Sequence, residues 1–79
     1  MPRYFFHVLD GKDMPDEDGV ELPDRAAVRA EAIRASGQML ADMGGAWHGE
    51  EWQMNVADES GRVVLRLQFS ATEMPDAAA

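Results

Sequence analysis

The sequence contains no cysteine, so neither a disulfide nor a thiolate-bound metal can stabilise its fold. Positive charge is also scarce, since 7 Lys and Arg stand against 15 Asp and Glu, for a formal net charge of -8. Nucleic-acid binding needs basic side chains that neutralise phosphates, so this balance argues against a nucleic-acid partner. No apolar run approaches the roughly 20 residues that span a bilayer, and no signal peptide is recognisable. We therefore expect a cytoplasmic protein that does not associate with a membrane.

The chain is also short, and its 79 residues predict a single domain at the small end of the usual range. We expect this domain to cover residues 1–70 and the tail at residues 71–79, which has no hydrophobic pattern, to be disordered. A domain of this size buries only about 60% of the surface of its unfolded chain, so its stability is marginal. Oligomerisation is a common supplement in such cases, and we expect a homodimer.

Two strand-like segments precede the middle of the chain. Arg3–Leu9 is rich in aromatic and β-branched residues and ends at the turn dipeptide Asp10-Gly11. Lys12–Asp18 is strongly acidic and predicts a mobile loop, after which Gly19–Leu22 can form a short strand that pairs with the first. Alternation in the first strand places one set of side chains on each face, Tyr4, Phe6 and Val8 on one and Phe5, His7 and Leu9 on the other.

A helix is predicted over Arg25–Met43, because most of its residues are strong helix formers. Asp24 can accept a hydrogen bond as the N-cap, and the glycines that follow Met43 favour termination. At 100° per residue one broad arc of the helix is apolar, and we expect it to close the core, so that Ile33→Asp would unfold the domain. The residues of this arc are Val28, Ala32, Ile33, Ala35, Met39, Leu40 and Met43.

Two alternating segments follow the helix, Glu51–Ala57 and Arg62–Phe69, joined by the turn Asp58–Gly61. Their inward residues are predicted to be Trp52, Met54 and Val56 in the first and Val63, Leu65, Leu67 and Phe69 in the second. The element order is β-β-α-β-β. This order predicts an α+β fold, a two-layer sandwich in which one helix packs on one face of a mostly antiparallel sheet.

Three stretches of sequence carry a resemblance to a known family: PRYFFHVLDG at residues 2–11, DEDGVELPD at 16–24 and WQMNVADESGRVVLRLQF at 52–69. They resemble a family of small uncharacterised alphaproteobacterial proteins, known only as a domain of unknown function. The resemblance implies a bacterial cytosolic setting and supports the domain boundaries, and it implies no catalytic residues or ligands. The layout alone is also similar to that of HicB-type antitoxin domains, which is a likeness of fold.

Homodimerisation or partner binding is predicted to use an exposed edge of the sheet or, as the better candidate, the face of the sheet opposite the helix. This face should mix aromatic, amide and arginine side chains, and it lacks the acidic residues that crowd the rest of the chain. Aromatic residues and arginine are enriched at the centres of protein interfaces. The candidate interface residues are Phe5, His7, Leu9, Gln53, Asn55, Val64, Arg66 and Gln68.

Arg29 is unusual because a charged residue falls inside the apolar arc of the helix, with Arg25 one turn earlier. We expect an ion pair between Arg29 and Asp18 that ties the acidic loop to the helix. The alternative is that the aliphatic part of Arg29 covers the rim of the core while its guanidinium reaches solvent.

No arrangement of residues points to catalysis or to a bound metal. The loop around Asp16 partly resembles a calcium-binding loop, but Met14 stands at the first ligand position and Arg25 at the place of the bidentate glutamate. His7 and His48 have no spacing that requires them to share a metal. We therefore expect a protein that is not an enzyme, binds no cofactor and acts by protein–protein contact. The alternative is an antitoxin-like or regulatory subunit whose acidic loop contacts a basic protein.

Overall fold

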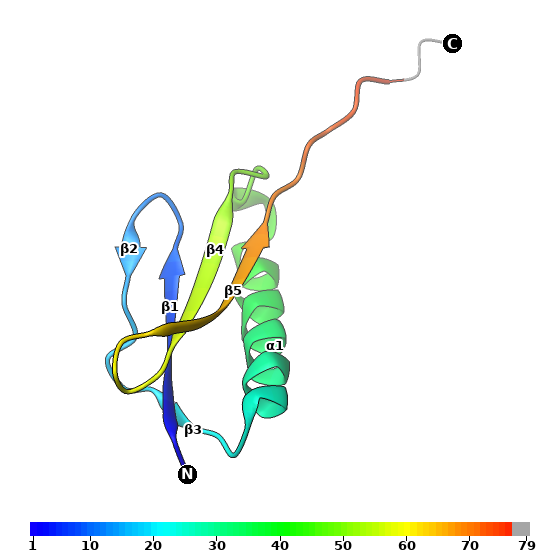
Figure 1. Cartoon of the computed structure of the whole chain (residues 1–79). Helices are drawn as coiled ribbons and strands as arrows, with labels where there is room; N and C mark the ends of the chain where they lie inside the picture. Colours follow the sequence, from blue (N-terminus) through cyan, green and yellow to red (C-terminus); the bar gives the residue numbers. More distant parts are fainter. Residues whose placement is uncertain (77–79) are drawn as a thin grey trace.

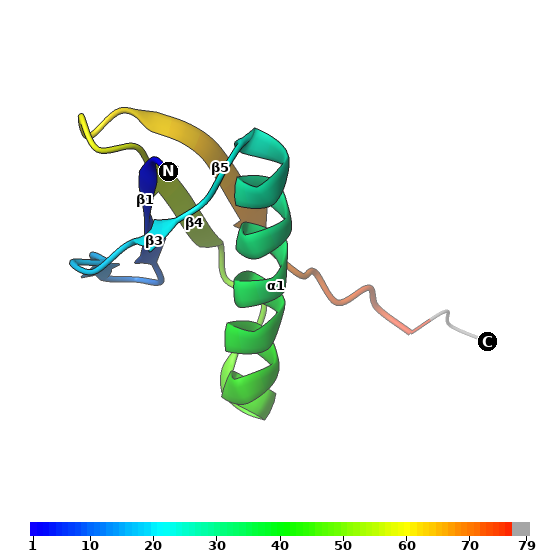
Figure 2. The same cartoon turned by 90° about the horizontal axis from the view of Figure 1, so that it is seen from below.

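The computed structural model describes residues 1–76 and has one long helix beside an antiparallel sheet of five strands, which confirms the predicted α+β class. In chain order the elements are β1 (Arg3–Leu9), β2 (Asp13–Met14), β3 (Val20–Glu21), α1 (Arg25–Met43), the 3-10 turn η1 (Gly44–Ala46), β4 (Trp52–Ala57) and β5 (Val63–Phe69). The helix covers one face of the sheet (Figures 1 and 2). Residues 71–76 form no helix or strand and lead away from the body, and the end of the predicted tail, 77–79, lies outside the described residues.

The sheet has the strand order β2-β1-β4-β5, and β3 also pairs with β1. β4 and β5 form a hairpin, and β4 returns antiparallel to β1 after the helix. The hairpin turn is held by Asp58, whose carboxylate accepts hydrogen bonds from the backbone of Ser60 and Arg62 and from the Ser60 hydroxyl. The hydrogen bond from that hydroxyl is the main reason why the pKa of Asp58 lies below its ordinary value.

The core lies between α1 and the two central strands. Trp52, Met54 and Val56 of β4 are almost completely buried beneath Val28 and Ala32 of the helix. Small helix residues at this contact allow the backbones to approach closely, and they include the fully buried Ser36, whose hydroxyl donates to the Met54 sulfur at 3.4 Å. The buried helix residues Val28, Ala32 and Ser36 are spaced by four, which is the narrow stripe expected where one helix crosses a sheet.

The predicted apolar arc is therefore too wide. Ile33 is 54% exposed and Met39 is 41% exposed, so the expectation that Ile33 closes the core is wrong. A single helix contacts a sheet along one stripe, and Ile33, about 100° around the helix from the buried Ala32, lies at the rim of that stripe. Ala35, Leu40 and Met43 stay partly buried against the core.

The structure confirms the predicted strand at Gly19–Leu22, whose middle is β3 and pairs antiparallel with β1. The acidic loop before it is more ordered than the sequence predicts, because its residues Asp13 and Met14 form β2, also along the outer edge of β1. Between these strands the Asp16 carboxylate accepts from the Phe6 N–H at 3.1 Å, in the place of a strand carbonyl. It also accepts from the N–H groups of Asp18 and Gly19, while the Asp16 N–H donates to His7 Nδ1 at 2.9 Å. The middle of the β1 edge is thus closed by one side chain.

A register shift in the β4–β5 ladder overturns one predicted side-chain direction. Val56 pairs with Leu65 and Ala57 pairs with Val63, so Val64 is the extra residue of a β-bulge. Val64 consequently faces the helix, where it lines a pocket with Val28, and Val63 is 47% exposed. The alternation in sequence predicted the reverse for these two residues, because a strict period of two has no place for an inserted residue.

Candidate functional site

The two outer edges of the sheet differ. The outer edge of β1, called here the β1 edge, is covered by β2, Asp16 and β3. Within residues 1–76 no strand pairs with the outer edge of the seven-residue strand β5, called here the β5 edge. An edge of this kind presents backbone N–H and C=O groups that can pair with another chain.

The register identifies the backbone groups at the β5 edge. Phe6 donates its N–H to Asp16, away from β4, so the backbone groups of its odd-numbered neighbours in β1 bond to β4. Their partners in β4 are also odd-numbered, and the even-numbered residues of β4 therefore bond to β5. The partners of these residues are Leu65, Leu67 and Phe69. Because bonding direction alternates along a strand, the N–H and C=O groups of Arg66 and Gln68 point outward.

The helix-facing side of β5 is also less covered than that of its neighbour. Trp52, Met54 and Val56 of β4 are at most 1% exposed, whereas Leu65, Leu67 and Phe69 of β5 remain only partly buried. Apolar area is therefore available beside the β5 edge. Ile33, at the rim of the helix, is exposed as well.

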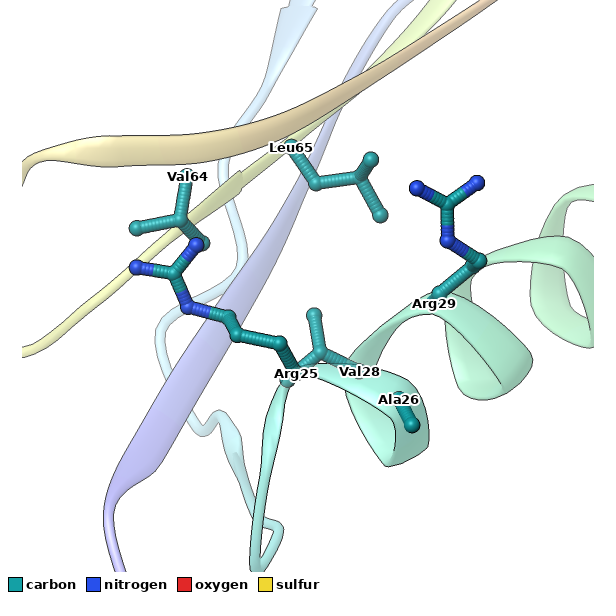
Figure 3. Close-up of a pocket in the computed structure, with 6 residues that line it drawn as sticks. All are labelled: Arg25, Ala26, Val28, Arg29, Val64 and Leu65. Atoms are coloured by element: carbon teal, nitrogen blue, oxygen red, sulfur yellow. The ribbon is translucent and has the colours of Figure 1, made fainter.

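A pocket of about 180 Å³ lies between the first turns of α1 and the start of β5. Buried Val28 and half-buried Leu65 contribute apolar walls, and Val64 reaches the pocket because of the bulge. The guanidinium groups of Arg25 and Arg29 extend from successive helical turns on the side that faces β5 (Figure 3). The pocket is thus apolar inside and positively charged at its rim.

Arg25 and Arg29 differ from Arg3, Arg34 and Arg66, whose side chains all have partners. Arg34 donates to Glu31 at 2.6 Å, Arg3 donates to the carbonyl oxygen of Asp18 at 2.8 Å, and Arg66 donates to the Asn55 side-chain oxygen at 2.6 Å. Within residues 1–76, neither Arg25 nor Arg29 forms a side-chain hydrogen bond or an ion pair. The nearby carboxylate of Asp24 caps the helix by accepting from the Ala27 N–H at 2.8 Å.

The predicted ion pair between Arg29 and Asp18 is therefore not present. Arg29 lies at the β5 side of the helix, whereas Asp18 lies beside Arg3 at the β1 edge. Arg3 ties the loop to the sheet instead, with a second contact to Glu21 at 3.7 Å. The pair of arginines four residues apart was visible in the sequence, but the strand that it faces depends on the sheet order.

A second hollow, of about 450 Å³, lies on the other side of the helix. Its walls are mainly apolar, with Met14, Val20 and Met39 among them. Two of the charged residues that line it, Glu31 and Arg34, are paired with each other, and a third, Asp16, accepts hydrogen bonds at the β1 edge. This pairing lowers the pKa of Glu31, first through the hydrogen bond from Arg34. The rim of this hollow therefore offers a ligand no uncompensated charge from that pair.

Seven of the eight candidate interface residues lie on one face of the sheet, and Val64 does not. Val64 lies on the helix side, as described above. The remaining candidates occupy the face of the sheet opposite α1, called here the open face: Phe5, His7, Leu9, Gln53, Asn55, Arg66 and Gln68. The rings of Phe5 and His7 stack on it, with centroids 6.4 Å apart, and the long strands β1, β4 and β5 contain no Asp or Glu.

Asp16 and His7, both considered as metal ligands, are used in closing the β1 edge. Burial opposes ionisation of Asp16, but hydrogen bonds from the N–H groups of Phe6, Asp18 and Gly19 outweigh it and lower its pKa. His7 Nδ1 is an acceptor, so a neutral ring carries its proton on Nε2. In the described part of the chain, no group of three His, Cys, Asp or Glu side chains is placed to hold a metal ion.

The helix is not apolar enough to cross a membrane, and the same holds for every helix among residues 1–76. No curated protein and no solved structure shows a significant match to the chain. One family model does match, and it spans residues 3–70, which include every helix and strand. On this match the chain belongs to the family described as Domain of unknown function (DUF6894).

Proposed function

We propose that this protein is a non-catalytic protein-interaction module that binds an extended segment of a partner protein along the β5 edge. The partner segment adds a strand to the sheet, and its backbone pairs with the outward groups of Arg66 and Gln68. The bacterial cytoplasmic setting implied by the family resemblance is part of this proposal.

The observation that carries the proposal is the unequal treatment of the two sheet edges. The β1 edge is covered along its length, whereas the β5 edge has only a bulge at its start. Native proteins usually protect a long edge strand with charges, bulges or a covering element. A regular edge from Leu65 to Phe69, beside partly exposed apolar side chains, has the arrangement that strand addition uses.

Selection of binders from a random-peptide display library on the full chain tests the proposal. The selected peptides are then added to isotope-labelled protein, and the shifted backbone amides are mapped by NMR. We expect the largest shifts along β5, centred on Arg66 and Gln68, together with helix residues that line the pocket. Selected peptides that shift other surfaces and leave β5 unchanged would show that the β5 edge is not the binding site.

Gln68→Pro supplies a direct test, because proline removes the outward N–H and does not interrupt the bonds between Leu67 and β4. We expect peptide binding to fall at least tenfold, about 1.4 kcal/mol. Gln68→Ala is the matched control, since it removes the side chain and keeps the N–H. Circular dichroism of both variants verifies the fold, and the NMR map of the wild type decides the question if Gln68→Pro does not fold.

The homodimer is a second candidate, for which the open face is the favoured surface. The three long strands contribute no carboxylate to it, so two copies can approach there with less of the repulsion that a net charge of -8 creates elsewhere. Sedimentation at increasing concentration should show a dimer. Leu9→Lys and Asn55→Lys should weaken it, because each adds positive charge to the open face of both copies. A monomer at millimolar concentration contradicts this candidate.

In the regulatory-subunit alternative, the binding surface is the acidic loop at the β1 edge. Asp13, Glu17 and Asp18 are exposed on the acidic loop, and a basic protein would be their partner. The peptide selection separates this alternative from the main proposal. Lys- and Arg-rich peptides that shift the loop would favour a regulatory subunit, whereas peptides that shift β5 favour strand addition.

A further inference from the structure

The pocket at the start of β5 indicates which kind of segment binds there. We propose that the added segment is acidic and that one of its Asp or Glu carboxylates lies between the guanidinium groups of Arg25 and Arg29. This inference rests on the proposed strand addition and specifies the chemistry of the partner.

The charge distribution is the first reason. Arg25 and Arg29 are neighbours on one face of the helix, and like charges at this spacing destabilise a helix. The chain has 15 acidic residues, yet neither arginine is paired within residues 1–76. The two guanidinium groups flank a pocket instead, Arg25 beside Val64 and Arg29 beside Leu65 (Figure 3). A carboxylate there would relieve their repulsion and supply the acceptor that both guanidinium groups lack.

The geometry of an added strand is the second reason. Its side chains alternate between the open face and the helix side. A side chain of the added strand on the helix side, level with Leu65, would enter the pocket that Arg25 and Arg29 flank in Figure 3. Guanidinium groups bind carboxylates through parallel N–H donors, which a planar carboxylate accepts at its two oxygens.

The apolar walls fit the rest of such a side chain. The aliphatic part of an Asp or Glu residue would contact Val28 and Leu65, and a volume of about 180 Å³ is sufficient for one side chain. Ile33 lies one helical turn beyond Arg29 and is exposed. It offers an apolar contact to a neighbouring residue of the segment, so we expect an aliphatic residue two positions away from the acidic one.

The selection experiment, repeated on Arg25→Gln/Arg29→Gln, tests the inference. On the wild type, we expect peptides that shift β5 to share one Asp or Glu position. Replacing that residue by Asn or Gln should weaken binding about tenfold, the size of a charge-assisted hydrogen bond. On the double variant, the same replacement should change affinity less than twofold. The preference for the acidic peptide should also decrease between 50 and 500 mM NaCl, since salt screens exposed charges.

Lys12→Gln/Arg62→Gln is the matched control, because it removes two positive charges at exposed positions outside the pocket lining. It should retain the full preference for the acidic peptide. If it loses the preference as the pocket variant does, net charge and not the pocket selects the peptide, and the inference is wrong.

The failure of the inference and the failure of strand addition have different signatures. Peptides that shift β5 without any acidic preference overturn the inference and leave strand addition intact. If no selected peptide shifts β5, both fail. A dimer that Gln68→Pro dissociates would assign the β5 edge to a second copy of the chain, and this result also overturns the acidic partner.

Discussion

The β1 edge and the β5 edge belong to the same sheet, but the chain completes only one of them. At the β1 edge, β3 and β2 pair with β1 near its two ends, and the Asp16 carboxylate accepts from the Phe6 N–H between them. At the β5 edge, the outward backbone groups of Arg66 and Gln68 have no strand partner among residues 1–76. The acidic loop therefore has a structural role at the β1 edge, and the β5 edge is where we propose that a second chain completes the sheet.

The same contrast holds for the charges beside each edge. The loop on β1 uses Asp16 internally and is tied down by Arg3. The helix rim beside β5 carries Arg25 and Arg29 without partners in the described chain. If the β1 edge serves the fold and the β5 edge binds a partner, changes at the β1 edge should reduce stability. Changes at the β5 edge should reduce binding and leave the fold intact.

Among the changes at the two edges of the sheet, Gly19→Ala at the β1 edge should cause the largest loss of stability. Gly19 has a φ of 72°, and an added Cβ would lie 2.9 Å from Phe5 and from the Tyr4 carbonyl oxygen. Backbone strain and the overlap together should cost about 3 kcal/mol in the free energy of unfolding, measured by urea denaturation. Gly11→Ala is the control, since Gly11 has a φ of 71° and open space around it, and it should cost only about 1 kcal/mol. Equal losses for the two variants would show that Gly19 is not packed against β1.

Asp16→Asn should destabilise the fold by about 2 kcal/mol at pH 7, because one amide oxygen cannot replace both carboxylate oxygens as acceptors. The pKa of Asp16 is lowered in the folded state, so its contribution is present above the ordinary value of 3.8. The contribution is lost as the pH falls from 3.8 through the lower folded pKa, and the difference between wild type and variant should shrink there.

The measurement for this prediction is urea denaturation at a series of pH values. Asp13→Asn is the control, since Asp13 is exposed in β2, and its effect should stay within about 0.5 kcal/mol. A stability gap between wild type and Asp16→Asn that is constant down to pH 2 would contradict the role of the ionised carboxylate.

Ile33→Asp tests the rim of the helix beside the pocket. Because Ile33 is 54% exposed, the loss should be about 1 kcal/mol, mostly from helix propensity and partial burial. Ala32→Asp, one residue earlier, places a carboxylate at a fully buried position and should prevent folding. Thermal melts followed by circular dichroism distinguish the two variants. An unfolded Ile33→Asp protein would show that Ile33 is part of the core after all.

The smallest effect is expected for the arginines beside the β5 edge. Arg25→Gln/Arg29→Gln should leave stability unchanged or raise it by about 0.3 kcal/mol, because the repulsion between like charges is removed. Arg34→Gln should change stability in the opposite direction, since it removes the ion pair with Glu31. Urea denaturation at low salt is the suitable measurement, because urea does not screen charges. A clear loss of stability in the double variant would indicate that Arg25 and Arg29 serve the fold.

Local patterns in the sequence were sufficient for much of the fold. The bounds of the helix, its cap at Asp24 and the hairpin of β4 and β5 follow from propensity, capping and alternation, and the structure confirms them. The same patterns failed at Ile33, Val64 and the acidic loop. In each case the outcome depends on contacts between segments that are distant along the chain, such as the width of the helix–sheet contact or the pairing of Asp16 with Phe6.

The sequence by itself determined the element order and which strands lack negative charge, because both are properties of neighbouring residues. It also showed two arginines one helical turn apart. Only the tertiary structure decided that β1 and β4 lie at the centre, that the acidic loop closes one edge and that the arginines face the other. Strand order is set by long-range packing and pairing, and a local pattern carries no information about which strand a helix face will meet.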